Sequence, residues 1–547
     1  MWGSPKFSSA ASSPLYPLLL TPFPGTEFQR LLPLFWNLAE EPPDLSFHHL
    51  SVDPIPPLEQ LVDAHRRWGD EHWSADALER AAGENEWTDE MRTAAEAARD
   101  EFESEHDRLV GGLEALRDGD ELRHAFQLMN ETLMHSSRGR YDSWRPFQIG
   151  FVLATARAVS EPSAESFADV VWFATGGGKT ETYLGLVVWA AFLDRVTGKS
   201  TGVTAWSRFP LRLLSLQQTQ RFADAMAGAE LVRRSHDIDG DPFSVGFLVG
   251  ESSTPNRIDE DPQDDWRPDP EDPTMPARYQ VLMSCPFCFG SEIEMAFDHR
   301  TWTLEHRCAA SDCPWPEPAL PFYVVDDEIY RFLPTVVVGT LDKIASVSMQ
   351  AAMAGLFGPP RGMCPKERHG HVYAKRSKKP SGCLVPGCER NKTDLPMAED
   401  RYGPTFRLQD ELHLLRDSLG AVNAHYEGLM DHLQRERSGS AAKILGSSAT
   451  LSGYEHQTEV LYRKPGRVFP VQGPSTDVGF WTAASDDVSR RHVSLAPRGS
   501  TLEFANDRVV TVLQQQIRRL AATPAEVCAE AGVDPTHAEL LLSLFGT

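Results

Sequence analysis

The stretch Asp169-Val-Val-Trp-Phe-Ala-Thr-Gly-Gly-Gly-Lys179-Thr-Glu-Thr-Tyr-Leu184 decides the fold. Its apolar start predicts a strand, three glycines follow, and Lys179 and Thr180 open a predicted helix. Glycines let backbone N–H groups surround phosphates, and the positive end of the helix dipole adds to the attraction. Glycine clusters also occur in ordinary turns, but here the order of strand, loop and helix predicts a nucleotide site.

The phosphate loop has one departure from the usual pattern. Lys179 would supply a point charge to the phosphates, and the Thr180 hydroxyl would ligate magnesium. The formal Walker spacing has Gly or Ala where this chain has Phe173. That departure affects the first turn of the loop and not the phosphate cradle. The predicted nucleotide-binding residues of the loop are Thr175, Gly176, Gly177, Gly178, Lys179 and Thr180.

A second acidic site is needed for hydrolysis, since magnesium and the attacking water must both be held. The run Phe406-Arg-Leu-Gln-Asp410-Glu411-Leu-His-Leu-Leu415 places two adjacent acids after a short apolar segment. Asp410 would bind magnesium, and Glu411 would position and polarise the water. Adjacent acids are common on solvated helix faces. Here, however, a further strand pattern, Lys443-Ile-Leu-Gly446, is followed by the small residues Ser447-Ser448-Ala449-Thr450.

In this order the three segments resemble motifs I, II and III of superfamily 2 helicases. The resemblance implies ATP as the nucleotide, Lys179, Asp410 and Glu411 as catalytic residues, and DNA as a partner. It also implies that four residues couple hydrolysis to nucleic-acid movement, namely His413, Ser448, Ala449 and Thr450.

Three further segments fit the same family. Arg145-Pro-Phe-Gln148 resembles the motif whose glutamine reads adenine. The segments 209–217 and 337–343 resemble motifs Ia and Ib, which line the nucleic-acid path in such enzymes. The residues that this resemblance assigns to nucleic acid are Pro210, Arg212, Gln217, Gly339 and Thr340.

Within the superfamily the sequence resembles the helicase subunit of the DISARM anti-phage system. The resemblance extends over roughly residues 120 to 460 and rests on three segments, 125–130, 174–183 and 409–415. It implies a role in antiviral defence, with other subunits of the defence system as partners.

The composition limits the remaining possibilities. The chain has 547 residues, 41% of them hydrophobic, and a net charge of −25. Such a charge argues against a protein that coats nucleic acid by bulk electrostatics, but not against a helicase with a local basic groove. No run approaches the length of a membrane span. The apolar segment 15–20 is interrupted by Pro17 and makes a poor secretory signal, so we expect a cytoplasmic enzyme without a membrane partner.

The cysteines form two groups. Cys285, Cys288, Cys308 and Cys313 have a C-x2-C and C-x4-C spacing, which predicts a tetrahedral zinc site. The alternative is two pairs of buried free thiols. A second group combines Cys364, Cys383 and Cys388 with either His369 or His371, so its fourth ligand is open. Cys528 is left over and fits a small buried hydrophobe.

We therefore expect an α/β fold, a RecA-like P-loop lobe with a parallel sheet, preceded by a helical domain and carrying zinc-ribbon-like inserts. The predicted parts are an unassigned segment 1–74, a helical accessory domain 75–140, the lobe 141–470 and a segment 471–547. The lobe carries inserts at 251–322 and 357–402. The last segment is expected to be a linker and the possible start of a second lobe.

Arginine-rich motif VI and motif V are not found in the sequence. Because these motifs sit on a second lobe in superfamily 2, we expect either a fragment of a longer helicase or a second lobe on a separate polypeptide. The leading interpretation is the motor lobe of a DNA helicase or translocase. An ATP-gated binding protein is the alternative, and an unrelated P-loop kinase fits poorly. The basic run 375–379 is a solvated face or a nucleic-acid contact.

Overall fold

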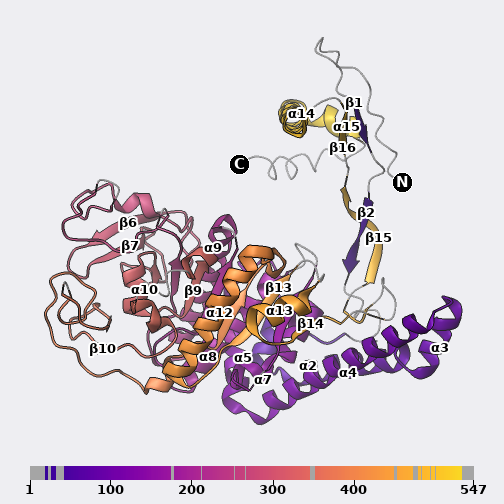
Figure 1. Ribbon diagram of the computed structural model, residues 1–547, viewed down its shortest axis with the longest axis horizontal. Coiled ribbons are helices and arrows are strands. Elements are labelled where there is room, and N and C mark those ends of the chain that lie inside the picture. The colour runs from indigo at the N-terminus through magenta and orange to yellow at the C-terminus, as the bar shows by residue number, and fades with distance from the viewer. Residues whose placement is uncertain are drawn as a thin grey trace. The chain divides into compact units, whose positions relative to one another are not determined.

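The computed structural model describes residues 19–22, 26–32, 42–164, 166–173, 178–210, 212–251, 253–264, 267–344, 351–377, 379–448, 453–471, 473, 479–481, 483–492, 495–498 and 501–531. The chain divides into two compact units (Figure 1). One unit comprises residues 33–483, and the other comprises residues 1–32 together with 484–547.

The centre of the larger unit is an eight-stranded sheet in the order β14-β3-β13-β12-β4-β9-β5-β8. Neighbouring strands run parallel throughout. The expected parallel α/β sheet is therefore confirmed. Its strands are β3 (Ala168–Trp172), β4 (Ala205–Phe209), β5 (Val245–Leu248), β8 (Phe322–Tyr323), β9 (Val336–Thr340), β12 (Phe406–Gln409), β13 (Lys443–Ser448) and β14 (Gly466–Phe469).

Helices cover both faces of the sheet. Side chains alternate along a strand, and β9 shows the result, since Val336 and Val338 join one apolar cluster while Val337 joins another. The first cluster includes α8 (Lys179–Val196) and α9 (Arg212–Ser235). The second includes α10 (Asp326–Phe332), α12 (Asp417–Ser438) and α13 (Tyr454–Tyr462). The unit is thus a three-layer sandwich.

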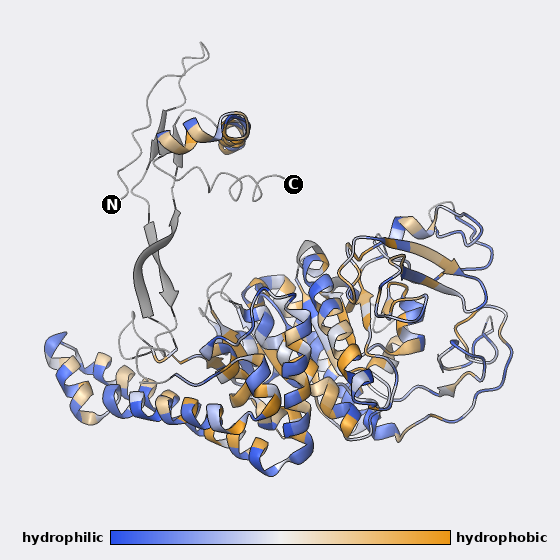
Figure 2. Cartoon of the chain, turned by 180° about the vertical axis from the view of Figure 1, so that it is seen from behind, coloured by the Kyte–Doolittle hydropathy of each residue, from blue (hydrophilic) through white to orange (hydrophobic). Residues whose placement is uncertain are grey.

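Helices precede the sheet and pack on one of its layers. They are α1 (Phe47–Val52), α2 (Ile55–His72), α3 (Ala75–Glu84), α4 (Asp89–Asp118), α5 (Asp120–Ser136), α6 (Pro146–Ala154) and α7 (Ala156–Ser160). Helical structure begins before Ala75, the predicted start of the helical domain. On α8, Trp189 donates to the carbonyl of Leu122 at 3.0 Å and lies edge-on to Phe126. The first half of α4 is mostly exposed and largely hydrophilic (Figure 2).

The two inserts contain short elements only. The first holds η2 (Pro276–Tyr279) and a hairpin of β6 (Ile293–Asp298) and β7 (Thr303–Cys308). The second holds β10 (Gly362–Met363), β11 (His371–Val372) and η5 (Glu399–Tyr402). Between β9 and the second insert lie α11 (Leu341–Ile344) and η4 (Ala351–Leu356).

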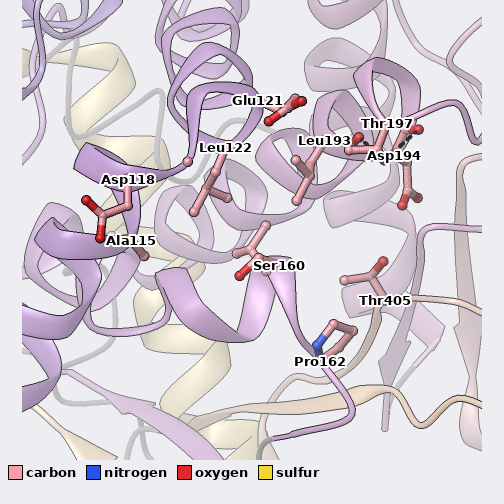
Figure 3. Close-up of a pocket in the computed structure, with 12 residues that line it drawn as sticks. Ala115, Asp118, Glu121, Leu122, Ser160, Pro162, Leu193, Asp194, Thr197 and Thr405 are labelled. Atoms are coloured by element: carbon pink, nitrogen blue, oxygen red, sulfur yellow. Dashed lines mark hydrogen bonds between the residues drawn. The ribbon is translucent and has the colours of Figure 1, made fainter.

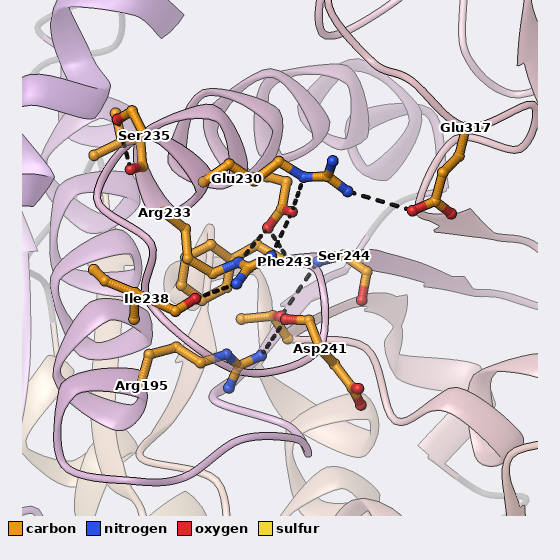
Figure 4. A network of polar contacts seen from close by, with 12 residues as sticks. Arg195, Glu230, Arg233, Ser235, Ile238, Asp241, Phe243, Ser244 and Glu317 are labelled. Carbon is orange, nitrogen blue, oxygen red and sulfur yellow. Dashed lines mark hydrogen bonds and ion pairs between the residues drawn. The ribbon is translucent and has the colours of Figure 1, made fainter.

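A polar network fixes the turn between α9 and β5 (Figure 4). The buried Glu230 carboxylate accepts hydrogen bonds from Arg233, Arg234 and the backbone N–H of Phe243. Arg234 also reaches Glu317 in the first insert, at 3.3 Å. Because buried charges are stable only when they are paired, this network ties the end of α9 both to the sheet and to the insert.

The smaller unit pairs strands from the two ends of the chain. β1 (Leu19–Pro22) is antiparallel to β16 (Leu495–Arg498), and β2 (Thr26–Leu32) pairs with β15 (Ala483–His492). Two helices follow, α14 (Leu502–Ala522) and α15 (Pro524–Ala531). Cys528 on α15 is buried. Among the helices that the structure describes, none is long and apolar enough to cross a membrane.

Candidate nucleotide site and metal clusters

The phosphate loop joins β3 to α8. Three of its predicted residues, Thr175, Gly176 and Gly177, lie outside the described residues. Gly178 precedes α8 with φ of +99°, a conformation that a side chain rarely adopts. An added Cβ there would lie 2.5 Å from Gln148 Nε2. Position 178 therefore favours glycine for its conformation, and a side chain there would also displace the Gln148 amide.

Phe173, which replaces the usual small residue, has a packing partner. Its ring stacks on Phe147 of α6, with centroids 4.0 Å apart and planes 7° from parallel, and it is buried. The residue at the end of β3 that leads into the loop is thus held against the helix that carries Gln148.

Lys179 and Gln148 both contact the phosphate loop. Lys179 Nζ donates to the carbonyl of Phe173 at 2.6 Å. Burial lowers the pKa of this lysine, while the charges of Glu411 and Asp410 act against the shift. Gln148 Nε2 donates to the carbonyl of Gly178 at 2.9 Å. Gln148 on α6 therefore contacts the last glycine of the loop, and Lys179 on α8 contacts the residue just before the loop.

The acid pair lies at the same edge of the sheet. β13 separates β12 from β3, and the carboxyl ends of these parallel strands carry Asp410 and the phosphate loop. The Tyr183 hydroxyl lies 3.3 Å from Asp410 Oδ2 and 3.3 Å from Thr180 Oγ1. The two predicted magnesium ligands thus share one buried neighbour. Sequence reasoning missed Tyr183, although its place one helical turn after Thr180 was a signal.

Glu411 has an unusual backbone conformation. Its φ is +49°, the left-handed region that residues other than glycine seldom occupy. Its carboxylate lies 3.3 Å from His413 Nδ1, which in turn lies 3.4 Å from Ser448 Oγ. Burial and the charge of Asp410 raise the pKa of Glu411, which suits a proton acceptor.

The coupling residues lie beside the acid pair. Ser448 ends β13 and is buried, whereas Ala449 and Thr450 lie outside the described residues. Gln457 on α13 donates to the carbonyls of Leu412 and Leu415 at 2.7 and 2.6 Å. The helix after the Ser-Ala-Thr segment therefore fixes the turn that follows Glu411. Sequence reasoning missed this contact.

The predicted nucleic-acid residues lie on neighbouring strands and one helix. Pro210 follows β4, Gly339 and Thr340 end β9, and Phe209 is opposite Thr340 in the register. Gln217 is exposed on α9. Arg212 begins α9, but its side chain is outside the described part of the chain. A Cβ at Gly339 would lie 2.7 Å from the Leu248 carbonyl, so this glycine also serves packing.

The first cysteine group converges. Cys285, Cys288, Cys308 and Cys313 place their sulfurs within 4.8 Å of one another. Cys285 Sγ lies 3.7 Å from Cys313 Sγ, and Cys288 Sγ lies 3.6 Å from Cys308 Sγ. Four thiolates about 2.3 Å from a tetrahedral zinc would stand about 3.8 Å apart. The spacing of these sulfurs fits such an ion.

The second group also converges, and its histidine is His369. Cys364, His369, Cys383 and Cys388 lie within 4.8 Å of one another and are all buried. Cys364 Sγ is 3.8 Å from Cys388 Sγ, and Cys383 Sγ is 3.5 Å from His369 Nδ1. His371 instead places Nδ1 3.0 Å from the Arg331 carbonyl. Both groups could hold zinc.

A separate hollow of about 650 Å³ is lined by residues of α4, α5, α7 and α8 (Figure 3). Its lining includes Asp118, Glu121, Ser160, Asp194 and Thr405. Thr405 directly precedes β12, so the hollow lies at the amino-terminal edge of the sheet. The predicted nucleotide residues lie at the opposite edge.

The sheet order, the loop after β3 and the acids after β12 define a RecA-like P-loop lobe of the helicase type. The chain is similar to DISARM protein DrmA of Bacillus paralicheniformis, with 30% identity over 404 residues, which are 69% of this chain. That similarity confirms the resemblance to the DISARM helicase subunit predicted from the motifs. The chain spans about a third of the length of that relative, 35%.

Two solved helicases show distant likenesses. The DUF1998 helicase MrfA has 13% identity and a TM-score of 0.31, with 64% of this chain and 33% of that chain covered. Mss116p bound to single-stranded RNA and AMP-PNP has 13% identity and a TM-score of 0.32, with 62% and 42% covered. No protein-family model matches the chain.

Proposed function

We propose that this chain is the motor lobe of an ATP-dependent DNA helicase or translocase in bacterial anti-phage defence. One observation carries the proposal, namely that Lys179, Thr180 and the Asp410-Glu411 pair meet at the carboxyl edge of one parallel sheet. The similarity to DrmA supports the defence role and the partnership with other defence subunits.

Each residue has a task in this proposal. The loop 175–180 holds the phosphates of ATP, and Gln148 contacts adenine. Thr180 and Asp410 would hold magnesium, which supplies positive charge to the phosphates. Glu411 orients water and accepts its proton, and the raised pKa of its carboxyl group favours that role.

Hydrolysis would be coupled to DNA through the turn after Glu411. His413 connects Glu411 to Ser448, and Gln457 holds the carbonyls of Leu412 and Leu415. A movement of Glu411 on hydrolysis would therefore displace Ser448 at the end of β13 and Gln457 on α13. Ala449 and Thr450 would belong to the same path.

DNA would lie across the carboxyl ends of β4 and β9, where the motif Ia and Ib segments are neighbours. Its candidate contacts are Pro210, Arg212, Gln217, Gly339 and Thr340. Full turnover would also need a positive charge from a second motor lobe. In related motors an arginine supplies this charge and raises the rate of hydrolysis by roughly 10³–10⁵. We therefore expect slow hydrolysis by this lobe alone.

The two cysteine groups would each hold one structural zinc. Sulfur and nitrogen ligands at these spacings suit a closed tetrahedral site without an open position for substrate. The metals would then stabilise the inserts rather than take part in ATP hydrolysis.

The test is the rate of ATP hydrolysis with and without DNA, measured for the chain combined with a second motor lobe. Wild type should be stimulated by DNA, and Glu411→Gln should bind ATP without turning it over. Normal turnover in Glu411→Gln would move the catalytic role elsewhere. ATP-dependent DNA binding without any turnover in wild type would favour an ATP-gated binding protein instead.

A further inference from the structure

Arg331 on α10 contacts both cysteine-bearing inserts. Its side chain is 1% exposed and donates four hydrogen bonds to backbone carbonyls. Two acceptors, Thr301 and Trp302, are at the tip of the β6–β7 hairpin and lie 2.7 Å from the guanidinium. The other two, Arg368 and His369, belong to the second insert, at 2.7 and 3.0 Å.

The backbone carbonyl of Arg331 also contacts the second insert. Its carbonyl lies 3.0 Å from His371 Nδ1. Gly370 lies against the same carbonyl, since an added Cβ would be 2.3 Å from it, and its φ is +73°. The loop that presents His369 to the cysteines therefore folds around Arg331.

The two inserts also touch each other. Trp302 packs against the apolar cluster formed by Cys364, Cys383, Cys388 and their neighbours. Arg368 of the second insert pairs with Glu305 of the first at 3.1 Å. On the same helix as Arg331, Glu328 accepts the backbone N–H of Leu304 at 2.7 Å. Contacts from α10 and from the second insert thus both hold the hairpin that leads to Cys308.

From this arrangement we propose that the two cysteine clusters form one metal-binding module centred on Arg331, in which zinc at either cluster strengthens zinc binding at the other. Arg331 is a positioning residue, because its guanidinium donates to backbone carbonyls of the two inserts. The inference rests on the proposal that both clusters hold zinc.

The physical reason lies in the buried guanidinium. If the second insert loses its metal and unfolds, Arg331 loses two of its four carbonyl acceptors together with the loop that covers it. The guanidinium can then turn to water, and hydrogen bonds that compete with water contribute little net free energy, so the contacts with Thr301 and Trp302 weaken and Cys308 is held less firmly. Coupling of this kind is reciprocal, and loss of the first zinc weakens the second equally.

The experiment follows zinc release from the full chain by a chelating dye. In Cys364→Ser/Cys388→Ser, which keeps the first cluster intact, the zinc of the first cluster should leave about 10-fold faster than it does from wild type, at a rate that matches neither of the two wild-type release phases. Arg331→Met, which keeps all eight ligands, should speed release from both clusters. Arg331→Lys serves if the Met variant does not fold, since it keeps the charge but cannot reach both pairs of carbonyls.

A matched pair of surface variants separates coupling from general loosening. Arg368→Ala breaks the ion pair between the inserts, whereas Arg307→Ala removes a partner of the same Glu305 from within the first insert, at 2.6 Å. Release should accelerate in Arg368→Ala and stay at the wild-type rate in Arg307→Ala.

Two results would overturn the inference. Release of the first zinc at the wild-type rate in both the double-serine and the Arg331 variants would mean that the clusters act independently, and the zinc assignment would still stand. Wild-type protein purified without chelator and found free of zinc would end the zinc assignment and this inference together.

Discussion

The hydroxyl group of Tyr183 lies 3.3 Å from Asp410 Oδ2, in a part of the lobe where both side chains are buried. The same hydroxyl lies 3.3 Å from Thr180 Oγ1. Burial and the charge of Asp410 raise the pKa of Tyr183 far above its usual value, so the hydroxyl stays protonated. It can therefore orient the carboxylate that we assign to magnesium.

Tyr183→Phe should weaken magnesium-dependent nucleotide binding without unfolding the lobe. The ring keeps its stacking against Phe222, and one net hydrogen bond of about 1 kcal/mol is lost. The magnesium concentration for half-maximal ATP binding should rise roughly fivefold. Tyr141→Phe is the control, since its hydroxyl contacts Glu181 and not Asp410. Equal magnesium dependence in the two variants would remove Tyr183 from the site.

Phe173→Ala should destabilise the protein although it restores the usual small residue of the phosphate loop. The change removes the stack on Phe147 and leaves a cavity where the buried Phe173 ring lies. Substitutions of this kind cost about 3 kcal/mol or more, so the midpoint of denaturant unfolding should fall. An unchanged midpoint would mean that the stack contributes no stability.

The histidines of the second insert provide a matched pair for metal analysis. His369→Ala should lose one of two zinc ions per chain, because His369 Nδ1 lies with the cysteines. His371→Ala should keep both, because His371 Nδ1 faces the Arg331 carbonyl. Loss of zinc from the His371 variant alone would reverse the ligand assignment. Cys285→Ser/Cys288→Ser should remove the other ion.

The parallel sheet could be predicted from the sequence because its signals are local. Glycines before Lys179 and acids after an apolar run mark strand ends, and strand ends share one edge in a parallel sheet. The first helices were missed for the opposite reason. Residues 47–72 mix Pro, Leu and polar residues without a clear helical period, and their apolar contacts come from α4 and α5.

Several site residues could not be predicted because their roles depend on contacts distant in sequence. The spacing of His369 and His371 admits either as a ligand, and they are distinguished by the contact of His369 with Cys383 and of His371 with the Arg331 carbonyl. Gln457 is an ordinary polar residue of a helix until its contacts with Leu412 and Leu415 are known. The structure does not describe Ala449 or Thr450, so their roles stay predictions.

The central claim is a nucleotide site around Lys179, and the most direct test is calorimetric titration of magnesium-ATP into wild type and Lys179→Ala. The ammonium group lies beside the loop and the acid pair, so its removal deletes a ligand contact while the sheet stays intact. The account predicts binding of one ATP by wild type and at least about 10-fold weaker binding by the variant. Equal affinity in two equally folded proteins would contradict it.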